Sequence, residues 1–158
     1  MPTNIANTIG RRGERIFELA MTNLNQFNIP RFNPGSLGEK WPGIDYYVEL
    51  CGVQNAVPFF FVQVKTTQKL IGDKRLDIRV NKQNCESLFK ITAPTYLAGV
   101  HEPTKRVFIL SVNTRPSKGI YHIPLQYELT SKNLDILHQE VLSFWKTFSY
   151  KPSTSHFL

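Results

Sequence analysis

The chain has 158 residues, a length that fits one domain with a hydrophobic core of its own. Hydrophobic residues make up 41% of the sequence and aromatic residues 12%, which argues against an intrinsically disordered chain. The formal net charge of +7 and the isoelectric point near 9.5 suit a polyanionic partner, although they do not identify one.

Several classes of protein find no support in the sequence. The N-terminal segment lacks the apolar core of a signal peptide, and no apolar run is long enough to cross a bilayer. We therefore expect a cytoplasmic protein without a membrane partner. Cys51 and Cys85 lack the spacing and neighbours of a zinc site and are predicted to be reduced thiols, and the four histidines are too scattered to bind a metal.

The first helix is predicted over Thr8–Asn25, because apolar residues recur there at helical spacing. Glu14 lies three and seven positions before Phe17 and Met21, so it shares the face that these residues turn toward the sheet. It is either a functional residue or a glutamate favoured by the helix N-terminus. The arginines around it, which either neutralise phosphates or remain solvated, are Arg11, Arg12 and Arg15.

A segment rich in Pro, Gly and Asn follows, Asn28–Pro42, and we predict that it is a loop. Phe32 and Trp41 are expected to anchor this loop to the core, with stacking on a nucleic-acid base as the alternative. The predicted loop ends shortly before Asp45.

Two strands, Asp45–Leu50 and Pro58–Lys65, are predicted to pair as an antiparallel hairpin. The second strand is apolar until it ends in an amide and an amine, Gln63 and Lys65, whose side chains share a face. An unpaired lysine or amide is costly to bury, so both side chains need partners. The start of the first strand lies beside the end of the second, and we therefore expect Asp45 close to Lys65.

Thr66–Lys74 is predicted to be a turn or flap, and Arg75–Val80 a further strand. The second helix is predicted over Asn81–Ile91, with Asn81 as its cap. Its inward-facing residues are expected to be Cys85, Leu88 and Phe89.

The remaining elements are a hairpin, a short apolar segment and an amphipathic helix. Thr95–His101 and Lys105–Val112 are predicted to form the hairpin, and Ile120–Leu125 is the short segment. Leu134–Tyr150 carries the clearest amphipathic pattern, and Lys151–Leu158 reads as a tail. We thus predict one domain over residues 1–150 of α/β (α+β) class, in which helices flank a mixed central β-sheet and an extra helix ends the chain.

Four short motifs occur in a characteristic order: GRRGE at Gly10–Glu14, GID at Gly43–Asp45, VQVKTT at Val62–Thr67 and PTYLAGV at Pro94–Val100. This pattern resembles the PD-(D/E)XK nuclease superfamily, and within it the prokaryotic domain of unknown function family 4365. The Q-x-K motif is also similar to that of Mrr-like restriction endonucleases. The resemblance extends over Gly10–Val112. It implies a restriction-endonuclease-like αβββαβ core, in which an Asp opens the second strand and (E/D/Q)-x-K closes the third.

The resemblance also implies roles for the site residues. Asp45 is expected to bind Mg²⁺ or Mn²⁺, together with the carbonyl of Val64, and Glu14 to bind it directly or through water. Gln63 can offer its amide oxygen but no negative charge, so metal affinity should fall. Lys65 is expected to orient the attacking water and to stabilise negative charge.

The first hypothesis is therefore an endonuclease that hydrolyses DNA in a prokaryotic defence or mobile-element context, with target choice dependent on dimerisation or a partner protein. One alternative is an inactive module that binds nucleic acid or a partner. Another is a ribonuclease toxin. A purely structural interpretation also stands, in which Asp45 and Lys65 form an ion pair and Gln63 is hydrogen-bonded to the backbone.

Overall fold

The structure is a computed structural model, and it describes residues 2–113, 118–148 and 155–157. Its helices are α1 (Pro2–Met21), α2 (Lys82–Phe89) and α3 (Ser131–Thr147), with a 3₁₀ turn at Leu125–Tyr127. Its strands are β1 (Phe32–Ser36), β2 (Tyr46–Leu50), β3 (Phe59–Thr67), β4 (Arg75–Val80), β5 (Thr95–His101), β6 (Arg106–Ser111) and β7 (Ile120–Pro124).

Within these residues, five strands form the main sheet in the order β1-β2-β3-β5-β6. β3 and β5 are parallel, and the other neighbouring strands are antiparallel. The parallel pair requires a crossover, and the chain between β3 and β5 includes β4 and α2. The fold is thus α+β with a mixed sheet flanked by helices, as predicted.

β4 and β7 lie outside the main sheet and pair antiparallel as a separate two-stranded sheet. The predicted strand Arg75–Val80 is confirmed, but it pairs with the short apolar segment Ile120–Pro124, which the sequence pattern left unassigned. The hairpin of β5 and β6 is confirmed as well.

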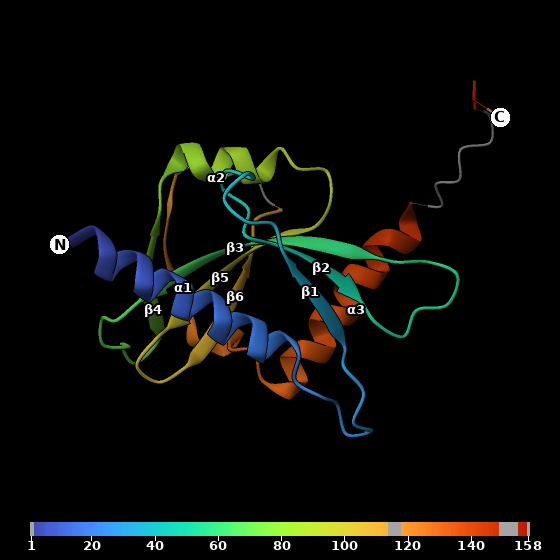
Figure 1. Ribbon diagram of the computed structural model, residues 1–158. Coiled ribbons are helices and arrows are strands. Elements are labelled where there is room, and N and C mark those ends of the chain that lie inside the picture. Colours follow the sequence, from blue (N-terminus) through green and yellow to red (C-terminus); the bar gives the residue numbers. More distant parts are fainter. Residues whose placement is uncertain (1, 114–117, 149–154, 158) are drawn as a thin grey trace.

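The main sheet separates two hydrophobic layers (Figure 1). On one face, β3 and β5 pack against α1 and α3, and on the other face the sheet packs against α2 and the β4–β7 sheet. Figure 1 shows α2 above the strands, α1 at the lower left and α3 rising along the right-hand side. Because β3 is covered on both faces, its sequence is apolar from Phe59 to Val64 except for Gln63, as expected for a central strand.

The loop prediction for Asn28–Pro42 is wrong over β1, which pairs with β2 from Phe32 opposite Leu50 to Ser36 opposite Tyr46. β1 lies at the edge of the sheet, where a strand tolerates Pro and Gly. Phe32 is buried, which confirms its anchoring role.

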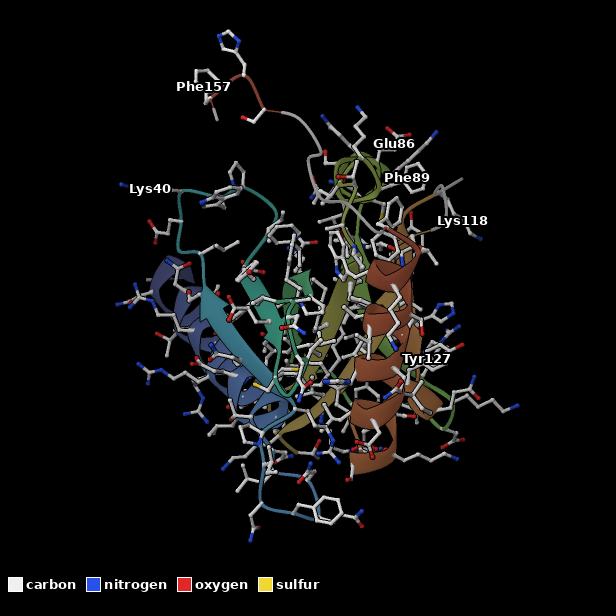
Figure 2. The ribbon with its side chains drawn as sticks, turned by 90° about the vertical axis from the view of Figure 1, so that its right-hand side faces the viewer. Lys40, Glu86, Phe89, Lys118, Tyr127 and Phe157 are labelled. Atoms are coloured by element: carbon white, nitrogen blue, oxygen red, sulfur yellow. The ribbon has the colours of Figure 1, made fainter. Side chains whose placement is uncertain are left out.

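Trp41 is 55% exposed, so the prediction that it anchors this segment is wrong. Trp41 lies in the segment between β1 and β2, and Lys40 beside it projects from the body of the protein (Figure 2).

The helix predictions need three corrections. α1 begins at Pro2 and ends at Met21, so it starts before Thr8. Asn81 caps α2 as predicted, by accepting the Asn84 N–H at 2.8 Å, but Phe89 is 37% exposed at the last position of this short helix (Figure 2). α3 begins one turn before Leu134, because the Thr130 side chain caps it.

Tyr150 and most of the predicted tail, residues 151–154 and 158, lie outside the described residues. In the part of the chain that the structure describes, no helix combines the length and apolar character needed to cross a membrane.

Candidate functional site

The side chain of Asp45 completes the hydrogen-bond ladder just before β2 begins. At the hairpin end of the pair, Leu50 N–H donates to the carbonyl of Pro58, just before β3, at 2.9 Å. In an antiparallel pair every second residue of a strand turns its backbone polar groups toward the same neighbour, here Pro58, Val62 and Val64 toward β2. At the other end of the pair, Asp45 N–H donates to the Val62 carbonyl at 2.9 Å. The Val64 N–H is then bound by the Asp45 carboxylate, with Oδ2 accepting at 2.6 Å. This bond fixes the carboxylate beside the Q-x-K segment.

A close approach of α1 to β3 positions Glu14. A Cβ on Gly13 would lie 1.8 Å from Thr66 Oγ1, so a glycine is needed where the helix crosses the strand. The Tyr46 hydroxyl donates to the backbone carbonyl of Glu14 at 3.2 Å and ties this turn of α1 to β2. The half-buried Glu14 carboxylate is thereby held near Asp45.

Burial disfavours the charged form of both carboxylates, and the charge of Asp45 adds to this effect at Glu14. Burial raises the pKa of Glu14, and the negative charge of Asp45 raises it further, while Arg11 acts in the opposite direction. Burial also raises the pKa of Asp45 despite the hydrogen bond from Val64 and the positive charge of Lys65. A cation at this position would relieve the repulsion between the two acids.

Lys65 lies where two clefts meet. One cleft, of about 490 Å³, runs from the end of β3 along the β4–β7 sheet. The other, of about 670 Å³, lies between α1 and β3 and is lined by Glu14 and Val64. Among the described residues no ion pair joins Lys65 to Asp45, so the simple ion-pair interpretation is not supported.

Gln63 is buried with an unsatisfied polar atom. Its side chain is 5% exposed, and Oε1 has no hydrogen-bond partner, so the predicted bond from this oxygen to the backbone is not formed. Leaving such an atom unpaired costs about 1–3 kcal/mol. Gln63 directly precedes Val64, whose N–H the Asp45 carboxylate binds. Gln63 is not among the residues that line either cleft, so its role as a metal ligand stays a prediction.

The oxygen donors predicted for the site are the carboxylates of Glu14 and Asp45 and the amide oxygen of Gln63. Over residues 2–113, 118–148 and 155–157, no cluster contains three or more His, Cys, Asp or Glu side chains suited to a metal ion. Mg²⁺ binds few carboxylates and keeps several water ligands, so this set fits Mg²⁺ better than an ion that needs a complete protein cage.

The three arginines of α1 that were predicted to bind phosphate differ in their contacts. Arg11 and Arg15 are exposed on α1. Arg12 instead pairs with Glu102, with Nε donating to Oε1 at 2.6 Å, and Gln68 donates to the same carboxylate at 3.1 Å. These bonds lower the pKa of Glu102 and tie α1 to the turn after β5. Arg12 is thus not simply solvated, and its role as a phosphate contact stays a prediction.

Two features of the site escaped the sequence-based prediction. One is the contact of Gly13 with Thr66, for which the signal was a glycine inside a helix, an unfavourable position unless packing requires it. The other is the exposed face of the β4–β7 sheet beside Lys65, for which the signal was the alternation of Arg75 and Arg79 with apolar residues.

Comparison of the chain with protein-family models, with curated proteins and with solved structures gives no match. The resemblance to PD-(D/E)XK nucleases thus stays a prediction based on short motifs.

Proposed function

We propose that the protein is a metal-dependent endonuclease that hydrolyses DNA phosphodiester bonds with Mg²⁺ or Mn²⁺. The observation that carries this proposal is the meeting of two carboxylates of raised pKa, Glu14 and Asp45, with the amine of Lys65 at one edge of the sheet. A phosphodiesterase needs these groups to hold a cation and to stabilise a phosphorane-like transition state.

The order of the elements supports the proposal. The succession α1-β1-β2-β3-α2-β5 follows the αβββαβ order that the resemblance implies. With β1 counted as the first core strand, Asp45 opens the second and the segment from Gln63 to Lys65 lies in the third. β4, β6, β7 and α3 are then additions to that core.

The cation would be held by Asp45 and Glu14, with the Gln63 amide oxygen as a neutral ligand and the Val64 carbonyl as the further donor that the resemblance implies. When bound, such a cation lowers the pKa of a water molecule and neutralises charge on phosphate oxygens. Since Gln63 brings no charge, the affinity for the cation should be lower than in a site with three acids.

The residues of the chain contribute orientation and charge. The bond to Val64 holds the Asp45 carboxylate in place, and the backbone of Glu14 is held by Tyr46. Lys65 reaches both clefts, so its ammonium group can donate to a phosphate oxygen and orient the attacking water.

The alternative function is a module that binds nucleic acid without cutting it. It is favoured by the number of acids at the site, since the described residues provide no third carboxylate there. A defence or mobile-element context, and the need for a second copy or a partner protein in target choice, follow from the resemblance alone and remain part of the proposal.

The proposal is tested by incubating purified protein with plasmid and single-stranded DNA in Mg²⁺, in Mn²⁺ and in EDTA. Lys65→Ala and Asp45→Asn are each expected to reduce the metal-dependent rate at least 100-fold, as expected when a charge that stabilises the transition state is removed. The matched controls are Lys132→Ala and Asp73→Asn, which change exposed residues that line neither cleft and should cut like wild type.

Cutting that survives EDTA, or that persists in both site variants, would point to a contaminating nuclease and contradict the proposal. Binding of DNA by all proteins without cutting by any would favour the binding module.

A further inference from the structure

The two-stranded sheet of β4 and β7 has a buried face and an open face. In β4 the apolar residues Leu76, Ile78 and Val80 are buried against the main sheet. The alternate residues Arg75, Asp77 and Arg79 are exposed, because successive side chains of a strand point to opposite faces. The strand therefore presents a row of charged groups to solvent.

An irregularity in the pairing adds an aromatic ring to this open face. The register of β4 with β7 shifts between Asp77 and Val80, which marks a bulge or similar irregularity. Tyr121 and His122 are consecutive, yet both are exposed and both line the same cleft. A bulge re-aims side chains in this way, and Tyr121 lines the same cleft as Arg75 and Arg79.

The cleft that this face borders is basic. Lys65, Lys69, Arg75 and Arg79 line it, and Asp77 is the acid among its lining residues. Arg75 lies 3.4 Å from Asp77, so one positive charge is partly neutralised. No ion pair involves Arg79, Lys69 or Lys65 among the described residues. Three cations therefore remain available to an anionic partner.

We propose that the open face of the β4–β7 sheet binds single-stranded DNA and leads it to Lys65. Phosphates would contact Arg79 and Lys69, and one base would stack on Tyr121, which is 51% exposed. A charged groove with an exposed aromatic ring is the combination that binds unpaired strands, because stacking needs a base free of its partner. This inference rests on the proposed function for the identity of the polymer.

The position of the cleft supports a strand that runs into the candidate site. Lys65 belongs both to this cleft and to the one between α1 and β3, where Glu14 and Val64 lie. A strand held along β4 and β7 would thus have a phosphate beside Lys65. The arginines of α1 are not needed for this path, because neither cleft includes Arg11 or Arg15 among its lining residues.

The test measures binding without cutting. The full-length chain is titrated in EDTA against a fluorescein-labelled 20-nucleotide DNA strand, with the unlabelled strand, its duplex and an RNA of the same sequence as competitors. Arg79→Ala combined with Lys69→Ala should reduce the slope of log affinity against log salt by about 1.4, since each contact to a single strand contributes about 0.7.

Two further sets of variants separate the contribution of the Tyr121 ring from that of the positive charges. Tyr121→Ala should weaken binding at least about fivefold, whereas Tyr121→Phe should retain it, because stacking needs the ring and not the hydroxyl. Lys132→Ala combined with Lys146→Ala removes the same charge from α3, on the opposite side of the main sheet, and should leave the salt slope nearly unchanged.

Three results would overturn the inference: salt slopes equal in the two double variants, equal affinity of Tyr121→Ala and wild type, or stronger competition by the duplex or the RNA than by the DNA strand. The result is independent of the nuclease assay. If the wild type cuts DNA but the β4–β7 variants bind DNA as it does, the proposed binding surface is refuted and the proposed nuclease activity stands. If these variants lose binding but the wild type does not cut, the binding surface stands and the nuclease activity is refuted.

Discussion

At the residue scale, Asp45 has two roles that different substitutions separate. Its carboxylate accepts the Val64 N–H and also supplies charge to the site. Asp45→Asn keeps an acceptor oxygen, so we expect lost cleavage with little loss of stability. Asp45→Ala also leaves the Val64 N–H without its partner, which should lower the free energy of unfolding by about 1–3 kcal/mol. Urea denaturation beside the cleavage assay measures both effects, and equal stability of the two variants would contradict the structural role.

The raised pKa values of Glu14 and Asp45 predict a pH effect of definite sign. In the folded state the pKa of each acid lies above its ordinary value, which is 4.5 for Glu14 and 3.8 for Asp45. Their contribution to stability therefore falls as the pH rises from these ordinary values through the raised folded ones. Glu14→Gln combined with Asp45→Asn should thus gain stability relative to wild type over this window.

Urea midpoints measured in EDTA between pH 3.5 and 7 test this effect, since acids elsewhere act equally in both proteins. Added Mg²⁺ at pH 7 should stabilise wild type and not the double variant, because only wild type provides the carboxylates. A difference between the two proteins that does not change with pH would contradict the electrostatic account.

At the element scale, the placement of α1 depends on Gly13. Gly13→Ala would put a methyl group 1.8 Å from Thr66 Oγ1, so the helix has to move away from β3. We expect a destabilisation of about 1–3 kcal/mol and a lower cleavage rate, since Glu14 moves with the helix. Gly10→Ala is the matched control, because its methyl group meets open space and should stabilise α1 by up to about 1 kcal/mol.

Thermal unfolding and cleavage rates of both glycine variants, with Thr66→Ala added to Gly13→Ala for partial rescue, provide the measurement. A Gly13→Ala protein as stable and active as wild type would show that α1 does not approach β3 this closely.

At the scale of the whole molecule, the buried Arg31 joins elements that are distant in sequence. It precedes β1, and its guanidinium donates to Asp135 at 2.5 Å and to Ser131 at 2.7 Å, both on α3. Arg31→Ala should lower Tm by roughly 2–8 °C, while Asp135→Asn, which keeps an acceptor, should lower it less.

Unfolding should remain a single transition in these variants, because β3 and β5 contribute side chains to both hydrophobic layers. Tryptophan fluorescence and circular dichroism should therefore give coincident curves. Two separate transitions would show that the layers unfold independently.

Much of this arrangement was predictable from local patterns. The alternation of side chains placed Gln63 and Lys65 on one face of a buried strand, and antiparallel pairing placed Asp45 at its end. These inferences succeed because strand period and hairpin geometry act over a few residues. The same local reasoning missed β1, whose Pro and Gly are acceptable only because it lies at a sheet edge.

Local patterns in the sequence were thus enough to predict the α+β class and the proximity of Asp45 to the Q-x-K segment. Three facts became known from the folded chain alone: Arg12 is bound to Glu102, Gln63 Oε1 lacks a partner, and β4 pairs with β7 beside Lys65. Each of these facts depends on contacts between residues far apart in the chain. Such contacts follow from how the layers pack, and no local period encodes them.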